Sequence, residues 1–146
     1  MFVKKSRKKA ITSFDKVTLS ISGMRYSIDY EIIRRDAEAE VTLYGVRYIT
    51  GGGRERTPEK TERVPAGKIV ELLNECDVMK WDAFHGKHPK KVFDGEMFSF
   101  AATVNDGEVI RADGSENFPK NYRKFKDMIR VLLESGNHTE NGREDK

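Results

Sequence analysis

The side chains best suited to chemistry lie close together in the middle of the chain. Positions 76 to 88 hold a thiol, an indole and four further potential metal ligands, namely Cys76, Asp77, Trp81, Asp82, His85 and His88. Histidine nitrogens and carboxylate oxygens bind metals and transfer protons, so Asp82, His85 and His88 form a candidate metal or active site. A structural zinc site of the usual kind needs paired cysteines, however, and this chain has a single cysteine. We therefore expect no catalytic residue, no metal and no other cofactor, and we keep this loop as the alternative site.

Cys76 continues an apolar pattern with helical spacing that includes Ala66, Ile69, Val70 and Leu73. This pattern predicts that the cysteine is a small core residue rather than a nucleophile. A thiol in apolar surroundings has a raised pKa and forms little thiolate. The sequence therefore favours a protein without catalytic activity.

A second set of residues is suited to binding. Tyr44 and Tyr48 alternate along one face of an expected strand, and Arg54 and Arg56 follow in the next polar stretch. Ser115 and Asn117 precede the last helix, where backbone N–H groups can hold an anion, although both side chains also suit a local turn. These six residues are the candidate binding residues.

The charge distribution argues against a nucleic-acid-binding domain. The 146 residues carry 27 Lys and Arg against 24 Asp and Glu, a net charge of +3. Five of the basic residues fall within positions 1–10, so the remaining chain holds 22 basic and 24 acidic residues. We expect a basic disordered arm at 1–14, with weak nucleic-acid binding through Lys4 to Lys9 as an alternative. No apolar run is long enough for a membrane helix, so we expect a soluble cytoplasmic protein without membrane contact.

The periodicity predicts an α+β fold. Strands are expected at 17–22, 25–34, 41–50, 97–104 and 108–113, and helices after Pro65 and Pro119. The element order is then β-β-β-α-β-β-α, giving a mainly antiparallel sheet of about five strands with two helices on one face. Positions 51–63 and 81–95 are expected to be loops. Tyr26 should lie on the buried face, whereas Asp29 and Glu31 should lie on a solvated one. One domain spans 15–135, and Gly136 ends the last helix before a disordered polar tail at 136–146.

The turn at Asn105-Asp106-Gly107 fixes the register of its hairpin. A three-residue loop pairs Val104 with Glu108 and keeps apolar residues opposite one another, which a two-residue loop does not. We therefore predict this register, with a type I turn followed by Gly107 in the left-handed conformation.

The span from about Val64 to Leu133 resembles an uncharacterised bacterial α+β domain family. The resemblance is carried by Trp81-Asp82-Ala83-Phe84, by Asn105-Asp106-Gly107 and by the run from Gly114-Ser115 to Phe118-Pro119. It implies an α+β fold and a bacterial source, and it brings no activity, cofactor or catalytic residue.

These observations together predict a small non-catalytic binding or interaction module. Its expected surface is the solvated sheet face with Tyr44, Tyr48 and the stretch from Gly51 to Arg63. The expected partner is another protein or a second copy of the chain. The alternatives are a small enzyme or metal-binding protein centred on Asp82, His85 and His88, and nucleic-acid binding through the arm.

Overall fold

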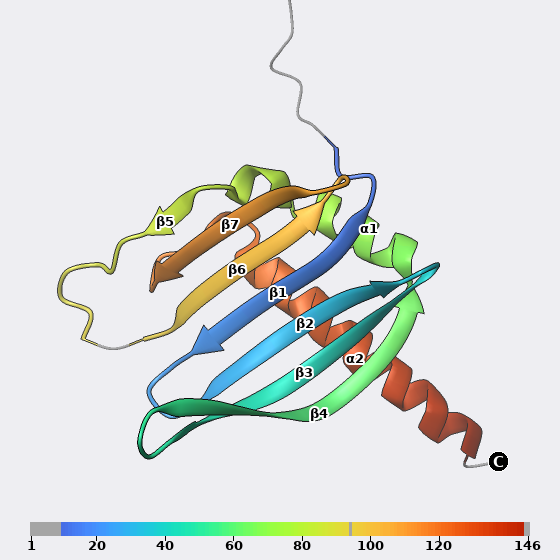
Figure 1. The fold of residues 1–146 in the computed structure, drawn as a ribbon, viewed down its shortest axis with the longest axis horizontal. Coiled ribbons are helices and arrows are strands. Elements are labelled where there is room, and N and C mark those ends of the chain that lie inside the picture. Colours follow the sequence, from blue (N-terminus) through green and yellow to red (C-terminus); the bar gives the residue numbers. More distant parts are fainter. Residues whose placement is uncertain (1–9, 94, 145–146) are drawn as a thin grey trace, which may run out of the picture.

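The computed structural model describes residues 10–93 and 95–144, with side chains as far as Glu134. A seven-stranded sheet forms one layer, and two helices pack on one of its faces (Figure 1). The elements in chain order are β1 (Phe14–Ser22), β2 (Ser27–Arg35), β3 (Glu38–Ile49), β4 (Gly53–Pro65), α1 (Ala66–Glu75), η1 (Val78–Trp81), β5 (Phe84–Gly86), β6 (Met97–Val104), β7 (Glu108–Ser115) and α2 (Tyr122–Glu144). Neither helix has a stretch that is long and apolar enough to cross a bilayer within the described residues.

The strands lie in the order β4-β3-β2-β1-β6-β7-β5. Every neighbouring pair is antiparallel except β5 and β7, which run parallel. The α+β class, the two helices and the mainly antiparallel sheet are confirmed. The expected five strands and their order are wrong, because four strands precede α1 and a short strand follows it.

Strand β4 is the main element that the periodicity did not predict. Its residues from Gly53 to Pro65 are mostly charged and mostly exposed, so they lack the apolar alternation of a half-buried strand. β4 lies at the edge of the sheet and pairs along nearly its whole length with β3. Charges and prolines are common on edge strands because they hinder pairing with another chain, and Pro58 lies at the register shift opposite Tyr44.

The core lies between the sheet and the helices. Trp81 is buried there, with its ring edge-to-face against Phe100 and Phe125 at centroid distances of 4.8 and 5.4 Å. Its Nε1 donates to the carbonyl of Lys120 at 3.0 Å, which satisfies the polar atom of a buried indole. Cys76 is fully buried, as predicted. Tyr26 is 47% exposed instead of buried, because β2 begins at Ser27, two residues later than expected, and Tyr26 lies outside the strand.

The β6–β7 hairpin has the predicted register. Val104 pairs with Glu108, Ala102 with Ile110 and Phe100 with Ala112. The predicted type I turn is wrong, because Asn105 and Asp106 both have positive φ, at 48° and 65°, before Gly107 at 119°. This is the pattern of a type I′ turn, whose twist matches that of the flanking strands.

Both expected domain boundaries move outwards. Ile11 and Phe14 are buried, so the ordered fold includes part of the segment expected to be a disordered arm. The rest of that arm, residues 1–9, lies outside the described residues. α2 continues past Gly136 to Glu144, which corrects the expected helix end and most of the expected tail. Glycine keeps its N–H group and costs a helix only about 1 kcal/mol relative to alanine, so it does not have to end one.

Candidate functional site

The sheet face opposite the helices carries a continuous row of polar residues. In register across six strands, the row contains Tyr44, Asp29, Ser20, Ser99, Asp113 and His85. This open face is polar, as predicted, but it is not uniformly solvated. Asp29 and Glu31 retain only 5% and 9% of their accessible surface, which contradicts their expected exposure.

Two arginines from β4 cover these carboxylates. Arg54 Nη2 lies 3.2 Å from Asp29 Oδ2, and Arg56 Nε lies 3.0 Å from the same oxygen. Arg56 Nη2 also lies 3.7 Å from Glu31 Oε1. Because β4 forms a hairpin with β3, and β3 pairs with β2, both guanidinium groups reach over β3 to the acids of β2.

Tyr44 and Lys16 complete this arrangement, which we call the arginine–carboxylate cluster (Lys16, Asp29, Glu31, Tyr44, Arg54 and Arg56). The Tyr44 hydroxyl donates to Glu31 Oε1 at 3.2 Å, and the Arg56 guanidinium lies 3.7 Å above the Tyr44 ring. Lys16 Nζ lies 3.4 Å from Glu31 Oε2. Burial and the hydrogen bond to Glu31 raise the pKa of Tyr44, so it keeps its proton at neutral pH.

The cluster is layered by charge. The side chains of Asp29 and Glu31 are only 8% and 11% exposed, whereas those of Lys16, Arg54 and Arg56 are 55%, 44% and 33% exposed. Three cations therefore lie above two anions, and the atoms that meet solvent are mainly the cationic ones. Such a surface attracts anionic groups at short range, even though the body of the chain is nearly neutral.

A small cavity of about 130 Å³ adjoins the cluster. Arg54, Asp29 and Tyr48 line it, and Tyr48 is 67% exposed. Four serines on neighbouring strands also line the cavity, namely Ser20, Ser22, Ser27 and Ser99. Hydroxyl and guanidinium donors thus meet at one place that is open to solvent.

The structure brings together four of the six predicted binding residues, namely Tyr44, Tyr48, Arg54 and Arg56. The sequence analysis missed the acidic half of the site, although Asp29 and Glu31 alternate visibly along β2. Their burial depends on β4, a segment whose pattern predicts a loop, so the local sequence around Asp29 and Glu31 does not indicate that they are buried.

Ser115 and Asn117 do not join this cluster. Ser115 ends β7, four strand spacings from β3, or roughly 19 Å away. Its hydroxyl lies 2.7 Å from His88 Nδ1, and Asn117 Nδ2 donates to the carbonyl of Lys87 at 3.1 Å. Both side chains therefore stabilise the loop after β5. This arrangement agrees with a role in local structure and not with an anion-binding site before the last helix.

The alternative residues Asp82, His85 and His88 each have a different partner. Asp82 Oδ1 accepts the backbone N–H of Arg111 at 3.1 Å, and His88 Nε2 donates to the carbonyl of Val92. His85 Nδ1 lies 2.5 Å from Asp113 Oδ1, but these side chains are 77% and 55% exposed. Within residues 10–93 and 95–134, no three metal-ligating side chains converge on one point. A histidine–carboxylate pair is thus present, and both of its side chains are largely exposed.

Comparison with known proteins does not assign this chain to a family or give it a function. No model of a known protein family matches the chain. No curated protein matches its sequence significantly. The resemblance noted from the sequence therefore stays a prediction, and the function has to be argued from the site itself.

Proposed function

We propose that this domain is a non-catalytic interaction module, and that its open sheet face binds carboxylate groups of a protein partner. The observation that carries the proposal is the layering of the arginine–carboxylate cluster, in which exposed cations lie over buried anions. Neither of the described helices lies on this sheet face, which leaves room for an extended segment of a partner (Figure 1).

The buried acids prepare the arginines for binding. Arg54 and Arg56 are both anchored to Asp29, and Arg56 also rests on the Tyr44 ring. Side chains that are already ordered lose less conformational entropy when a ligand arrives. A guanidinium group carries five N–H donors, so Arg54 can bond Asp29 and still offer donors to a second carboxylate.

The cavity beside Arg54 fits the same ligand chemistry. The four serine hydroxyls can donate hydrogen bonds to a carboxylate oxygen of the partner. The exposed Tyr48 ring offers an apolar surface to the rest of the partner segment. Aromatic and arginine side chains are enriched in protein interfaces for this combination of contacts. The partner class is therefore a protein segment rich in aspartate or glutamate.

An acetylated hexaglutamate peptide tests the proposal. Titrating it into ¹⁵N-labelled protein should shift the backbone amides of Asp29, Tyr48 and Arg54, and 0.5 M salt should weaken the binding. Charged hydrogen bonds contribute about 1.5–3 kcal/mol, so Arg54→Gln should weaken binding about tenfold or more.

Arg47→Gln is the matched control. Arg47 lies on the same hairpin, pairs with Glu55 at 2.7 Å and projects from the opposite face of β3. This variant should bind the peptide as the wild type does. An absence of shifts at millimolar peptide, or an equal loss of binding in both variants, would refute the proposal.

A further inference from the structure

Exposed apolar side chains are concentrated at one end of the sheet. Strands β1, β3 and β5 end there, and β2, β4 and β6 begin there, so the β1–β2 turn, the β3–β4 turn and the β5–β6 loop all lie at this end (Figure 1). Among the described residues, nine large apolar side chains are exposed, and seven of the nine lie here. We call this surface the apolar end (Met24, Tyr26, Tyr48, Ile49, Val92, Phe93 and Met97). Exposed apolar groups that gather at one place mark a contact with a protein or a membrane.

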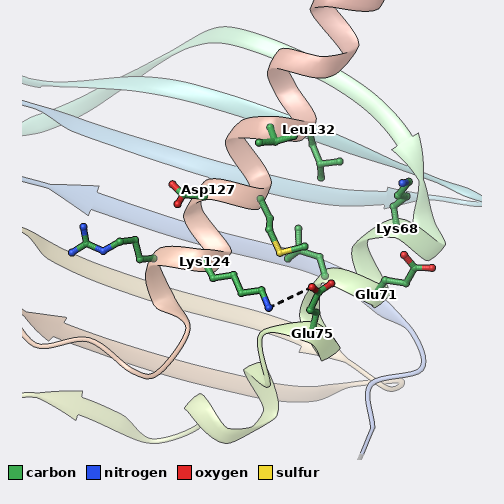
Figure 2. Close-up of a pocket in the computed structure, with 10 residues that line it drawn as sticks. Lys68, Glu71, Glu75, Lys124, Asp127 and Leu132 are labelled. Atoms are coloured by element: carbon green, nitrogen blue, oxygen red, sulfur yellow. Dashed lines mark ion pairs between the residues drawn. The ribbon is translucent and has the colours of Figure 1, made fainter.

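The other two exposed apolar residues lie elsewhere. Val109 lies beside the β6–β7 turn, at the opposite end of the sheet. Val131 lies on α2, at a groove of about 660 Å³ between the two helices (Figure 2). At that groove Lys124 Nζ pairs with Glu75 Oε2 at 3.4 Å, so these two rim charges already neutralise each other. The apolar end is therefore the place where exposed apolar surface accumulates.

Hydrogen bonds hold the β5–β6 loop in place against the sheet. His88 Nδ1 lies 2.7 Å from the Ser115 hydroxyl at the end of β7, and His88 Nε2 donates to the carbonyl of Val92. These bonds fix the backbone just before Phe93, whose side chain is 99% exposed. The loop therefore presents a large apolar ring to solvent from an anchored backbone.

The β1–β2 turn lies beside this loop. The Tyr26 hydroxyl donates to Glu96 Oε1 at 3.3 Å, which joins the turn to the end of the loop. Met97, the first residue of β6, pairs with Ser22, the last residue of β1. Met24 at the tip of the turn is 73% exposed, and Met97 is 53% exposed. Two neighbouring connections thus carry exposed apolar residues at the same end of the sheet.

Exposed cations accompany these apolar residues. Arg25 lies between Met24 and Tyr26 in the β1–β2 turn. Three lysines precede Phe93 in the β5–β6 loop, namely Lys87, Lys90 and Lys91. All four cations are exposed, and none of them forms an ion pair with another described residue. Their charges are therefore available to an anionic surface.

The acidic residues described at this end are directed towards the protein. Glu96 is half-buried and accepts hydrogen bonds from Tyr122 and Lys126 at 2.7 and 2.9 Å. Glu116 is also half-buried, and its Oε2 accepts the backbone N–H of Glu96 at 2.5 Å. Asp94 lies outside the described residues. Of the charges described in the two connections and beside them, those that meet solvent are thus mainly cationic.

An anionic lipid surface fits this combination of side chains. Apolar residues on separate connections would each need a matching pocket in a folded partner, because protein interiors are close-packed. Fluid acyl chains accommodate any arrangement of them, since the hydrophobic effect is not directional. Lysine and arginine can bury their apolar stems while their charged groups stay in water, at the level of the lipid phosphates. Anionic lipids attract such cations near the membrane surface.

We infer that the apolar end binds the surface of a membrane that contains anionic lipids, with Phe93 and Met24 inserted among the acyl chains. The lysines of the β5–β6 loop and Arg25 then face the lipid phosphates. The sequence predicted no membrane contact because it has no long apolar run, but a contact at the surface needs none. The inference is independent of the proposed function, because it does not use the arginine–carboxylate cluster. A protein that binds hexaglutamate but no vesicles would refute this inference alone.

Sedimentation with phospholipid vesicles tests the inference. The wild type should bind vesicles of phosphatidylcholine that contain about one-third phosphatidylserine, and it should bind much less to phosphatidylcholine alone. Phe93→Ser should weaken the binding by about tenfold or more, because the aromatic ring no longer enters the acyl region. Val109→Ser is the matched control, because Val109 is 42% exposed at the opposite end of the sheet, and this variant should bind as the wild type does.

A double substitution tests the role of the cations. Lys90→Gln together with Lys91→Gln should weaken the binding by about tenfold or more, because each lysine loses its attraction to the anionic lipids. Lys68→Gln together with Lys80→Gln is the control of equal charge, since these exposed lysines lie on α1 and η1 and not at the apolar end. Equal losses in the two double variants would show non-specific attraction and would contradict the inference.

Fluorescence tests the insertion itself. Phe93→Trp adds an indole at the tip of the loop, and its emission should move to shorter wavelengths when the anionic vesicles are added. Trp81 is buried, so its contribution should stay constant. A wild type that does not bind these vesicles, a Phe93→Ser variant that binds them normally, or an unchanged emission overturns the inference. Self-association that Phe93→Ser abolishes, without vesicle binding, would instead assign the apolar end to a second copy of the chain.

Discussion

The Asn105 side chain forms hydrogen bonds that connect residues 10–12 to the β6–β7 turn. Replacing Asn105 should separate the contribution of these bonds to stability from that of the backbone conformation. Its Oδ1 accepts the backbone N–H of Thr12 at 2.7 Å and the Thr12 hydroxyl at 3.0 Å. Its Nδ2 donates to the carbonyl of Ala10 at 3.1 Å. Between these bonds lies Ile11, which is 2% exposed. The turn thus holds a buried residue in place from a distance of more than 90 positions along the chain.

The expected magnitudes follow from these contacts and from the backbone. The side-chain bonds lie at an exposed turn, so their loss in Asn105→Gly should cost about 1–2 kcal/mol in total. Asn105 also has a φ of 48°, where asparagine is tolerated and alanine costs about 1–2 kcal/mol more. Asn105→Ala should therefore destabilise the fold by about 2–4 kcal/mol.

Asp106 provides the matched control for the backbone contribution. It lies in the same turn with a φ of 65°, and Asp106→Ala should cost only the left-handed penalty of about 1–2 kcal/mol. Free energies of unfolding from urea titrations of the three variants decide the matter. If Asn105→Ala costs no more than Asp106→Ala, the side-chain bonds contribute nothing. If Asn105→Ala and Asn105→Gly are equally destabilised, the backbone reasoning is refuted.

Two further predictions concern one buried and one partly buried ionisable group. Burial raises the pKa of Cys76 to about 11, so the folded protein should react slowly with thiol reagents at pH 7–8, and labelling as fast as that of a free thiol would contradict this. Burial alone would raise the pKa of Glu96, but hydrogen bonds from Tyr122 and Lys126 at 2.7 and 2.9 Å outweigh it and lower the pKa. Glu96 therefore stabilises the fold above the pKa of an unfolded glutamate, about 4.3, and this contribution disappears as the pH falls through the lower folded value. Glu96→Gln should cost about 2 kcal/mol at pH 7 and progressively less below pH 4, whereas a difference independent of pH would refute the role.

The local pattern of residues was sufficient for the parts of the fold that rest on short-range periodicity. The apolar spacing from Ala66 to Cys76 predicted α1 and the burial of the thiol, and both are confirmed. The alternation on both sides of Asn105-Asp106-Gly107 predicted the correct hairpin register, because a shift of one residue would turn the apolar side chains to solvent. The predicted turn type was wrong, because Asn105 and Asp106 both adopt the left-handed conformation of a type I′ turn, which suits the twist of the flanking strands.

The candidate site could be predicted from the sequence only in part. Tyr44, Tyr48, Arg54 and Arg56 were recognisable from their types, but their common location depends on β4. That strand is mostly charged, since an edge strand needs little apolar surface and its charges hinder pairing with another chain. Without β4, nothing in the alternation of β2 showed that Asp29 and Glu31 are buried.

The amino-acid sequence by itself determined the α+β class, the two amphipathic helices and the β6–β7 register, because each depends on residues within one or two turns or strands of one another. The tertiary structure alone decided that Arg54 covers Asp29 across 25 positions, that Ser115 and His88 meet, and that a groove separates α1 from α2. Only packing shows which charges share an exposed face, since burial and contact depend on segments that are distant along the chain.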